Sequence, residues 1–236
     1  MNTKPGGSKD YQFYGRRQGH ALRPARRKLV ETILPELRVV PPPDGNAIDL
    51  GHLFGEEKRS YRLEIGFGAG EHLAAMAAAN PDIGFIGCEP FVNGVAALLA
   101  LINERSLSNI RIYNDDARDL LPALPDAAFE RIYLLYADPW PKKRHNRRRF
   151  VQPDAVDTIA RLLRDGGSFR FASDFMDYVR WVLRCTVTHP AFQWTAQGPA
   201  DWRTRPDGSV ETRYEAKAKQ AGSNCVYLEF LRRPRN

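Results

Sequence analysis

An acidic residue followed by a dense run of basic residues is the feature of this sequence best suited to chemistry on a polyanion. Residues 137–150 read Ala-Asp-Pro-Trp-Pro-Lys-Lys-Arg-His-Asn-Arg-Arg-Arg-Phe, and they follow the apolar run 132–136. Asp138 is therefore expected where a buried strand ends, which is where open α/β sheets place their chemistry. The basic side chains would repel one another unless a phosphate chain neutralised them. The residues expected to contact phosphate are Lys142, Arg144, Arg147, Arg148 and Arg149.

A glycine-rich turn forms a second candidate site. Residues 63–65 have the character of a strand, and the chain then passes through Gly66, Gly68 and Gly70 into an expected helix. Glycines let the backbone approach a ligand closely and adopt positive φ. The dinucleotide fingerprint Gly-x-Gly-x-x-Gly would need a glycine at position 71, where Glu71 would instead repel a pyrophosphate. This spacing disfavours a nicotinamide oxidoreductase.

Three acids at the ends of three expected strands suit S-adenosyl-L-methionine, which carries an ammonium group, a sulfonium and a ribose diol but no phosphate. Glu64 lies two residues before the first glycine of the turn and can pair with the ammonium group. Glu89 ends the next strand and can accept hydrogen bonds from both ribose hydroxyls. Asp116 follows the third strand and can accept from the adenine amino group. Together with the glycine turn, these acids predict a site for this cofactor.

These motifs together resemble those of the tRNA (guanine-N7-)-methyltransferase family, in its bacterial single-subunit form. The resemblance covers about residues 61–231, with a weaker echo at 16–19, and its most specific part is Asp-Pro-Trp-Pro-Lys-Lys-Arg-His at 138–145. The other matching positions are 64–70, Glu89, 115–118, 147–150, Ser173 with Asp174, and Thr-Arg-Tyr-Glu at 212–215.

The resemblance implies methyl transfer from S-adenosyl-L-methionine to N7 of the guanine at position 46 in the tRNA variable loop. It implies an α/β fold, a doubly wound and mostly parallel sheet of the class I S-adenosylmethionine-dependent methyltransferase type. A basic N-terminal arm is expected from the composition of the first residues, and the part before Arg16 has no firm match in the family. Neither a metal nor an obligate protein partner is expected. The implied cofactor-binding acids are Glu64, Glu89, Asp116 and Asp138, and the implied substrate-binding residues are Lys142, Asp174, Thr212, Arg213, Tyr214 and Glu215.

The chemistry constrains the role of Asp138. Guanine N7 has an in-plane lone pair and no proton, so it can attack a methyl sulfonium without a general base. Asp138 is therefore expected to act electrostatically, by stabilising the charge that grows on the purine and by orienting the reactants. Guanine also needs acceptors for its N1 and N2 protons, which Asp174 and Glu215 could provide. Tyr214 could stack on the splayed base.

The elements that must position these residues alternate from residue 61 onward, as in a parallel sheet covered by helices. Strands are expected at 61–65, 83–88, 110–113, 131–137 and 168–172, and helices at 71–79, 92–105, 153–163 and 175–188. The runs 192–195 and 226–231 could add an antiparallel edge hairpin around a polar loop at 196–223. Before the sheet, residues 22–37 have helical character and 40–60 read as a linker.

Bulk properties narrow the class of protein. The chain has 236 residues and a formal net charge of +7, which favours a nucleic-acid partner. Lys4, Lys9 and six further basic residues fall within residues 1–30, against the single acid Asp10. Three widely spaced cysteines support neither a disulfide framework nor a zinc site, and no run resembles a signal peptide or a membrane span. We expect a cytoplasmic protein with an arm, helix and linker at 1–60 and a methyltransferase domain at 61–236.

Two other functions remain open at this stage. The chain could be a methyltransferase acting on a different RNA or on a small molecule, which a screen with unmodified bulk tRNA would separate. It could also be a non-catalytic RNA-binding protein on a degenerate methyltransferase fold. The four acids at 64, 89, 116 and 138 argue against degeneration, because a site that had lost its function would be expected to lose them.

Overall fold

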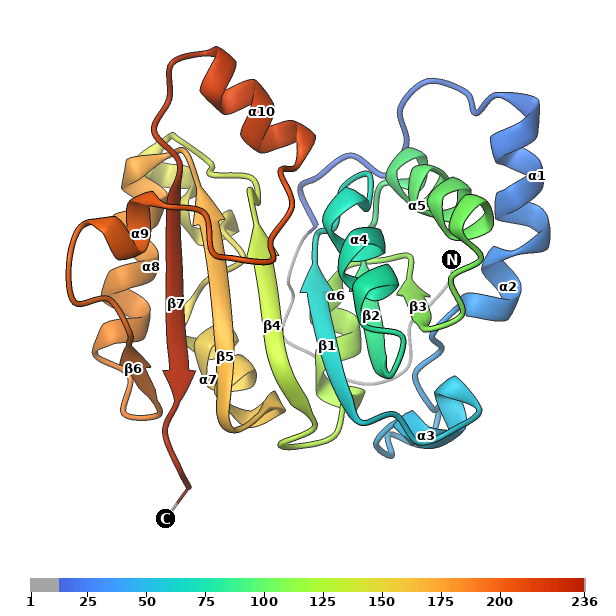
Figure 1. Cartoon of the computed structure of the whole chain (residues 1–236), viewed down its shortest axis with the longest axis horizontal. Coiled ribbons are helices and arrows are strands. Elements are labelled where there is room, and N and C mark those ends of the chain that lie inside the picture. Colours follow the sequence, from blue (N-terminus) through green and yellow to red (C-terminus); the bar gives the residue numbers. More distant parts are fainter. Residues whose placement is uncertain (1–12, 236) are drawn as a thin grey trace.

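The expected alternation of strands and helices builds one seven-stranded sheet (Figure 1). The computed structural model describes residues 13–235, so Lys4, Lys9 and Asp10 of the expected arm lie outside the described residues. The strands are β1 (Ser60–Ile65), β2 (Ile83–Cys88), β3 (Ile110–Tyr113), β4 (Phe129–Leu135), β5 (Leu163–Ser173), β6 (Phe192–Trp194) and β7 (Val226–Arg232).

The sheet order is β3-β2-β1-β4-β5-β7-β6, with β1 to β5 mutually parallel. Strand β7 runs antiparallel to both β5 and β6, which confirms the antiparallel edge pair. Chain order reverses between β1 and β4, and this reversal is where a doubly wound sheet opens a crevice for ligands. The carboxyl ends of the parallel strands point upward in Figure 1.

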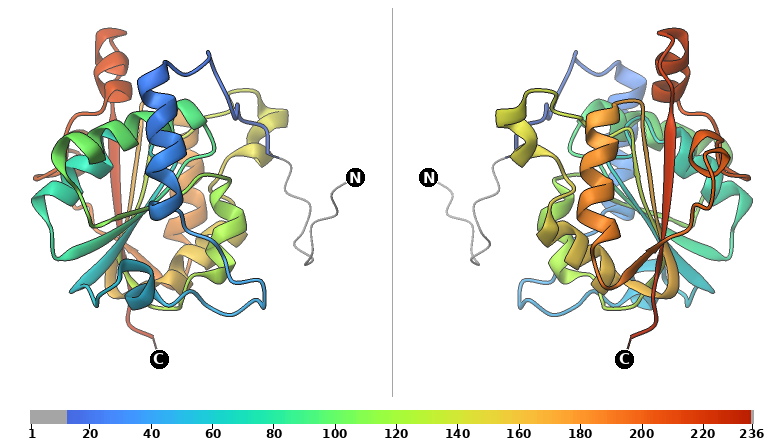
Figure 2. Two further views of the ribbon diagram at one scale, coloured as in Figure 1. Left: turned by 90° about the vertical axis from the view of Figure 1, so that its right-hand side faces the viewer. Right: turned by 90° about the vertical axis from the view of Figure 1, so that its left-hand side faces the viewer.

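Helices cover both faces of the sheet, and each face has its own apolar core. The helices are α1 (Pro24–Thr32), α2 (Leu34–Leu37), α3 (Leu50–Phe54), α4 (Glu71–Ala79), α5 (Val92–Arg105), α6 (Ala117–Leu120), α7 (Pro153–Leu162), α8 (Met176–Val187), α9 (Ala200–Arg203) and α10 (Arg213–Gln220), with 3₁₀ turns η1 (Leu121–Ala123) and η2 (Lys143–Arg148). One core joins α2, α4 and α5, and the other joins α6, α7 and α8. Figure 2 shows α1 and α8 at opposite ends of the sheet.

Residues 13–60 pack on the sheet rather than standing apart from it. Helix α1 lies along α5, and Val39 donates a backbone hydrogen bond to Ile112 of the edge strand β3 (2.8 Å). The expected linker at 40–60 contains α3 and the first residue of β1, and it buries Leu50 and Phe54 in the core. The boundary after residue 60 stays a prediction.

Several expected elements differ in the structure, and β5 begins at Leu163 rather than at residue 168. Strand β4 ends at Leu135 and not at residue 137, because Tyr136 has φ +53° and turns the chain out of the sheet. The prediction of a polar loop at 196–223 is wrong, because this segment contains α9 and α10. Helix α10 begins with a side-chain N-cap, in which the Thr212 hydroxyl accepts the N–H of Glu215 (3.2 Å), while the Glu215 carboxylate is bonded elsewhere. That Thr-x-x-Glu spacing was the sequence signal for the helix.

Candidate active site

The predicted acids gather at one edge of the sheet. Glu64 lies near the end of β1, Glu89 follows β2, Asp116 follows β3, Asp138 follows β4 and Asp174 follows β5. Because these five strands are parallel, their carboxyl ends share one edge. Topology therefore brings together acids that are separated by up to 110 residues in the sequence.

The glycine turn provides a close-packed cradle beside these acids. Gly66, Gly68 and Gly70 all have positive φ, at 72°, 59° and 81°. A Cβ at Gly94, in the first turn of α5, would lie 2.1 Å from the carbonyl oxygen of Gly68, so the helix presses directly against the turn. The three glycines thus adopt the backbone conformations that the spacing predicted.

Glu89 is buried and held by the same turn. Its Oε2 accepts the N–H of Gly68 (2.8 Å) and its Oε1 accepts the N–H of Phe91 (2.9 Å). Burial raises the pKa of Glu89, the two backbone hydrogen bonds oppose that shift, and the negative charge of Asp138 adds to it. The carboxylate is therefore fixed in orientation, and each oxygen keeps a further lone pair for a ligand.

Asp116 has two local partners. It caps the N-terminus of α6 by accepting the N–H of Arg118 (3.1 Å), and it pairs with the guanidinium of the same residue (Nη2 to Oδ2, 2.6 Å). The adjacent Asp115 pairs with Arg17 of the N-terminal segment (2.6 Å). That segment also contacts the start of α5, where Gly19 donates to Asn93 (2.8 Å). Residues 17–19 therefore border the edge of the sheet where these acids gather.

His72 is a site residue that the sequence reasoning missed. Its Nδ1 lies 2.7 Å from Oε2 of Glu64, and both side chains are buried. Tyr133 of β4 packs edge-on against the imidazole, with ring centroids 4.8 Å apart. The signal was available, because a residue in the first turn of the helix after a glycine turn can reach back to the preceding strand end.

The turn that contains Asp138 has unusual backbone geometry. Tyr136 and Trp140 both have positive φ, 53° and 45°, which non-glycine residues adopt only when their surroundings compel it. Asp138 itself is exposed, three residues past the end of β4. Trp140 packs edge-on against Tyr14 and His145, with centroids 6.1 Å away in both cases. Its placement in this aromatic cluster is a packing role.

The basic strip divides into exposed and buried cations. Lys142, Arg144 and Arg147 are exposed, and Arg148 is half-buried with its guanidinium 4.0 Å from the Tyr14 ring centroid. Arg149 is 1% exposed and bonded to Asp177 (2.5 Å). The prediction that Arg149 contacts phosphate is wrong for this structure, because its guanidinium lies inside the protein.

The motif at 212–215 folds over the glycine turn. A Cβ at Gly68 would lie 2.9 Å from Cε2 of Tyr214, so this half-exposed ring covers the turn. Arg213 stacks on the Tyr214 ring, with its guanidinium carbon 5.0 Å from the centroid. Thr212 is buried and caps α10. The structure thus brings Tyr214 to the cofactor edge while committing Thr212 to the helix.

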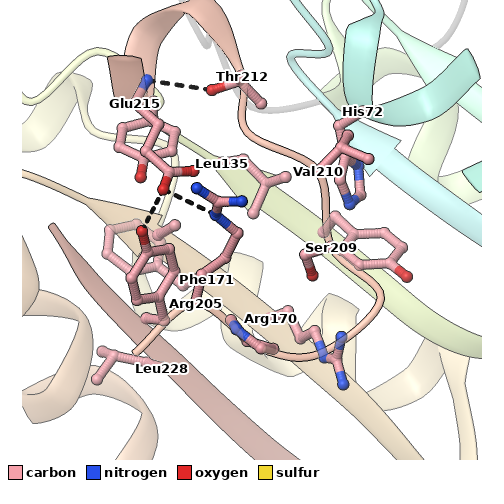
Figure 3. A pocket seen from close by; sticks show the side chains of 15 residues that line it. His72, Leu135, Arg170, Phe171, Arg205, Ser209, Val210, Thr212, Glu215 and Leu228 are labelled. Atoms are coloured by element: carbon pink, nitrogen blue, oxygen red, sulfur yellow. Dashed lines mark hydrogen bonds and ion pairs between the residues drawn. The ribbon is translucent and has the colours of Figure 1, made fainter. Parts of the chain in front are cut away.

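Glu215 is not free to read a base. It is 2% exposed, and its Oε1 accepts a hydrogen bond from Arg205 (2.9 Å; Figure 3). The same oxygen also accepts from Lys219 (2.8 Å) and from the Tyr227 hydroxyl (2.6 Å). Burial would raise the pKa of Glu215, but hydrogen bonds from Lys219, Tyr227 and Arg205 lower it below its ordinary value. The prediction that Glu215 contacts guanine is therefore corrected, and it anchors α10 instead. Asp174 remains exposed beside the end of β5.

Within residues 13–235 no group of three or more His, Cys, Asp or Glu side chains is arranged to hold a metal ion. Across the same described residues, no helix is both long enough and apolar enough to cross a membrane.

Known proteins share both the fold and the sequence. Residues 58–228 match the family described as "Putative methyltransferase". Solved structures with a similar fold include the 16S rRNA methyltransferase KamB (15% identity, TM-score 0.53, covering 75% of this chain and 89% of that chain). An rRNA methylase from Streptococcus thermophilus is similar too (11% identity, TM-score 0.52, with the same coverage). At these identities the likeness shows the class I methyltransferase fold alone.

Curated relatives named tRNA (guanine-N(7)-)-methyltransferase match nearly the whole chain. The protein from Rhodospirillum rubrum is 52% identical over 100% of this chain and 92% of its own length. Those from Agrobacterium fabrum (49%, 94% of this chain and 95% of that one) and Zymomonas mobilis (46%, 94% of both) agree. Because identity this high extends over almost the full length, the chain belongs to the tRNA (guanine-N(7)-)-methyltransferase family.

Proposed function

We propose that this protein transfers the methyl group of S-adenosyl-L-methionine to N7 of the guanine at position 46 in the variable loop of tRNA. The observation that carries the proposal is the convergence of the four acids at 64, 89, 116 and 138 on one sheet edge, beside an exposed cationic strip. Relatives with this named activity share about half of the sequence. We extend the proposal to a cytoplasmic location, where tRNA is modified.

The residues at this edge fit the cofactor. Gly66, Gly68 and Gly70 have positive φ and no Cβ, so the backbone of the turn can approach a ligand closely, and Glu89 is fixed by two N–H groups with lone pairs to spare for a ribose diol. Glu64 bonds to His72 through Oε2, which leaves Oε1 for an ammonium group. Asp116 would accept the adenine amino group while still pairing with Arg118. Bound here, the cofactor supplies an electrophilic methyl group to an in-line nucleophile.

Asp138 would act on charge and orientation rather than on a proton. Guanine N7 attacks through its lone pair and loses no proton, so the purine becomes more positive as the bond forms. A carboxylate just past the end of β4 would stabilise that charge. The negative charge of Asp138 also contributes to the raised pKa of Glu89. Holding the base in line with the methyl supplies the remaining rate enhancement.

Recognition of guanine would fall to Asp174 and Tyr214. Asp174 is exposed at the end of β5 and can accept both the N1 and N2 protons, whereas adenine offers no donor at N1. Tyr214 is 44% exposed over the glycine turn and provides a face on which a splayed base can stack. The exposed Lys142, Arg144 and Arg147 would hold the tRNA backbone.

Methyl transfer to unmodified tRNA, followed by nucleoside mass analysis, tests this proposal. We expect N7-methylguanosine in a tRNA with guanine at position 46 and none in a transcript with adenine there. Methylation of another nucleoside, or transfer to small molecules with no transfer to tRNA, would contradict it. An RNA that binds without any methyl transfer would support the non-catalytic alternative.

A further inference from the structure

We propose that Arg149 is a positioning residue that ties the turn carrying Asp138 to the helix that follows Asp174, and so fixes the spacing of the two acids that would flank the guanine. The effect of Arg149 on catalysis rests on the proposed function, whereas its bonds to the two turns are a property of the fold. Arg149 ends the basic strip in the sequence but contributes nothing to the basic surface.

Arg149 bonds to both turns at once. Its Nε donates to the carbonyl oxygen of Pro139, the residue directly after Asp138 (2.8 Å). Its Nη2 donates to Oδ2 of Asp177 in the first turn of α8, three residues after Asp174 (2.5 Å). One rigid guanidinium therefore spans the ends of the neighbouring strands β4 and β5.

Aromatic side chains of α8 enclose the same guanidinium. Its carbon lies 5.1 Å from the ring centroid of Tyr178 and 5.5 Å from that of Trp181. Both residues also bond to Val151, two residues after Arg149. The Tyr178 hydroxyl accepts the Val151 N–H (3.3 Å), and Trp181 Nε1 donates to the Val151 carbonyl oxygen (2.7 Å). A lysine could keep the charge, but it lacks the planar fork that reaches two acceptors in different directions.

The backbone of the Asp138 turn requires such support. Tyr136 and Trp140 flank Asp138 with positive φ, a conformation that persists only when surrounding contacts over-determine it. The bond from Arg149 falls on Pro139, in the middle of this strained stretch. The Tyr136 N–H supplies a second constraint, by donating to Ala172 of β5 (2.8 Å).

The charge on Asp177 is stabilised by the same contact. The hydrogen bond from Arg149 lowers the pKa of this half-exposed carboxyl, burial opposes the shift slightly, and the charges of Arg149, Arg184 and Arg180 add to it. The Asp177 carboxylate therefore remains ionised through the neutral range.

The test compares Arg149→Lys with Arg147→Ala and Arg161→Lys in the full chain. Arg147 is exposed on the strip, two residues away. Arg161 serves as the control because it contacts neither of the two turns, yet it too joins a carboxylate, Asp126, to backbone carbonyls, those of Leu121 and Leu124. For each variant, kcat and KM for tRNA, the salt dependence of tRNA binding, the melting temperature and hydrogen exchange of residues 136–141 are measured.

We expect Arg149→Lys to lower kcat about 10- to 100-fold, because small displacements of a reacting group cost that much, with tRNA affinity and salt slope unchanged. Arg147→Ala should instead raise KM and flatten the salt slope, and Arg161→Lys should lower the melting temperature without changing kcat. Asp177→Asn, a milder change at a half-exposed residue, should lower kcat less than Arg149→Lys does. Residues 136–141 should exchange faster in both variants of the pair.

Two outcomes would overturn the inference. One is a wild-type kcat and unchanged exchange at 136–141 in Arg149→Lys. The other is a raised KM with a flatter salt slope, which would return Arg149 to the phosphate-binding strip. If the wild-type protein itself forms no N7-methylguanosine, the proposed function fails, and the hydrogen-exchange comparison still decides whether the tie exists.

Discussion

The edge proposed for the cofactor and the side proposed to face tRNA differ in how their charged residues are held. At the cofactor edge, Glu89 and Asp116 are fixed by partners within two residues or by the adjoining glycine turn. On the tRNA side, Arg149 and Glu215 are fixed by residues from other elements, 28 residues away for Asp177 and 10 and 12 residues away for Arg205 and Tyr227.

This difference separates two ways of using a charge. Local turns present a carboxylate to a small ligand in a defined orientation, so sequence spacing is a good guide to its role. Partners that are distant in the sequence instead hold a charged group in the interior, where it links two parts of the protein. Two adjacent arginines in one basic run, Arg148 and Arg149, therefore differ in exposure although their sequence context is the same.

The strongest test of the comparison is Asp138→Asn, which removes an exposed negative charge just past the end of β4. We expect kcat to fall about 10²- to 10³-fold, as when a single electrostatic stabiliser is removed from an active site. Binding of tRNA, measured by filter retention, should remain near the wild-type value. Equal turnover by the variant at saturating substrates would show that Asp138 has no role in the chemical step.

Glu215→Gln tests the opposite case, a charge that is buried and bonded inside the protein. Because the buried carboxylate accepts three hydrogen bonds, two of them from cations, we expect a loss of about 2–3 kcal/mol in the free energy of unfolding, measured in urea. Glu211→Gln is the matched control, since this exposed acid shares Arg205 and Lys219 and should cost far less. Normal stability with weakened guanine selectivity in Glu215→Gln would restore its base-reading role.

Replacing Arg144 and Arg147 with Ala sharpens the comparison within the basic strip. Both side chains are exposed, and the log–log salt slope of tRNA binding should fall by about one for each lost phosphate contact. Arg105→Ala serves as a control, because α5 leads into the start of the parallel strand β3, so Arg105 lies toward the amino ends of the strands and away from the acids at their carboxyl ends. An unchanged slope in the double variant would remove the strip from the tRNA contact surface.

The smallest effect is expected at Glu89. Its raised pKa means that a fraction of the carboxyl groups is protonated in weakly acidic solution, and accepting hydrogen bonds from a ribose diol favours the ionised form. Cofactor binding should therefore release protons, and affinity should fall as pH falls, by at most about tenfold per pH unit. Calorimetry of S-adenosylhomocysteine in buffers of different ionisation enthalpy measures the release. Glu89→Gln should abolish it, and a persistent release would assign the proton to another group.

Much of the fold could be predicted because its signals are local. Apolar runs marked β1 to β5 within a few residues, and the glycine spacing marked the turn into α4. Helix α10 was missed although the Thr-x-x-Glu spacing of its N-cap was visible, since the polar composition of 196–223 outweighed a four-residue signal. The early end of β4 had no such signal, because Tyr136 is forced to positive φ by its surroundings and not by its own preference.

The sequence by itself determined the parallel sheet, the acids at its strand ends and the family to which the chain belongs, because each follows from short-range pattern and residue type. Only the tertiary structure decided which of those charges remain available. Arg149 and Glu215 carry the same charges as their exposed neighbours, yet packing encloses both and supplies partners from distant strands and helices. Burial favours such pairing because an unpaired ion inside a protein is costly. Spacing in the sequence does not predict which distant residue will be the partner.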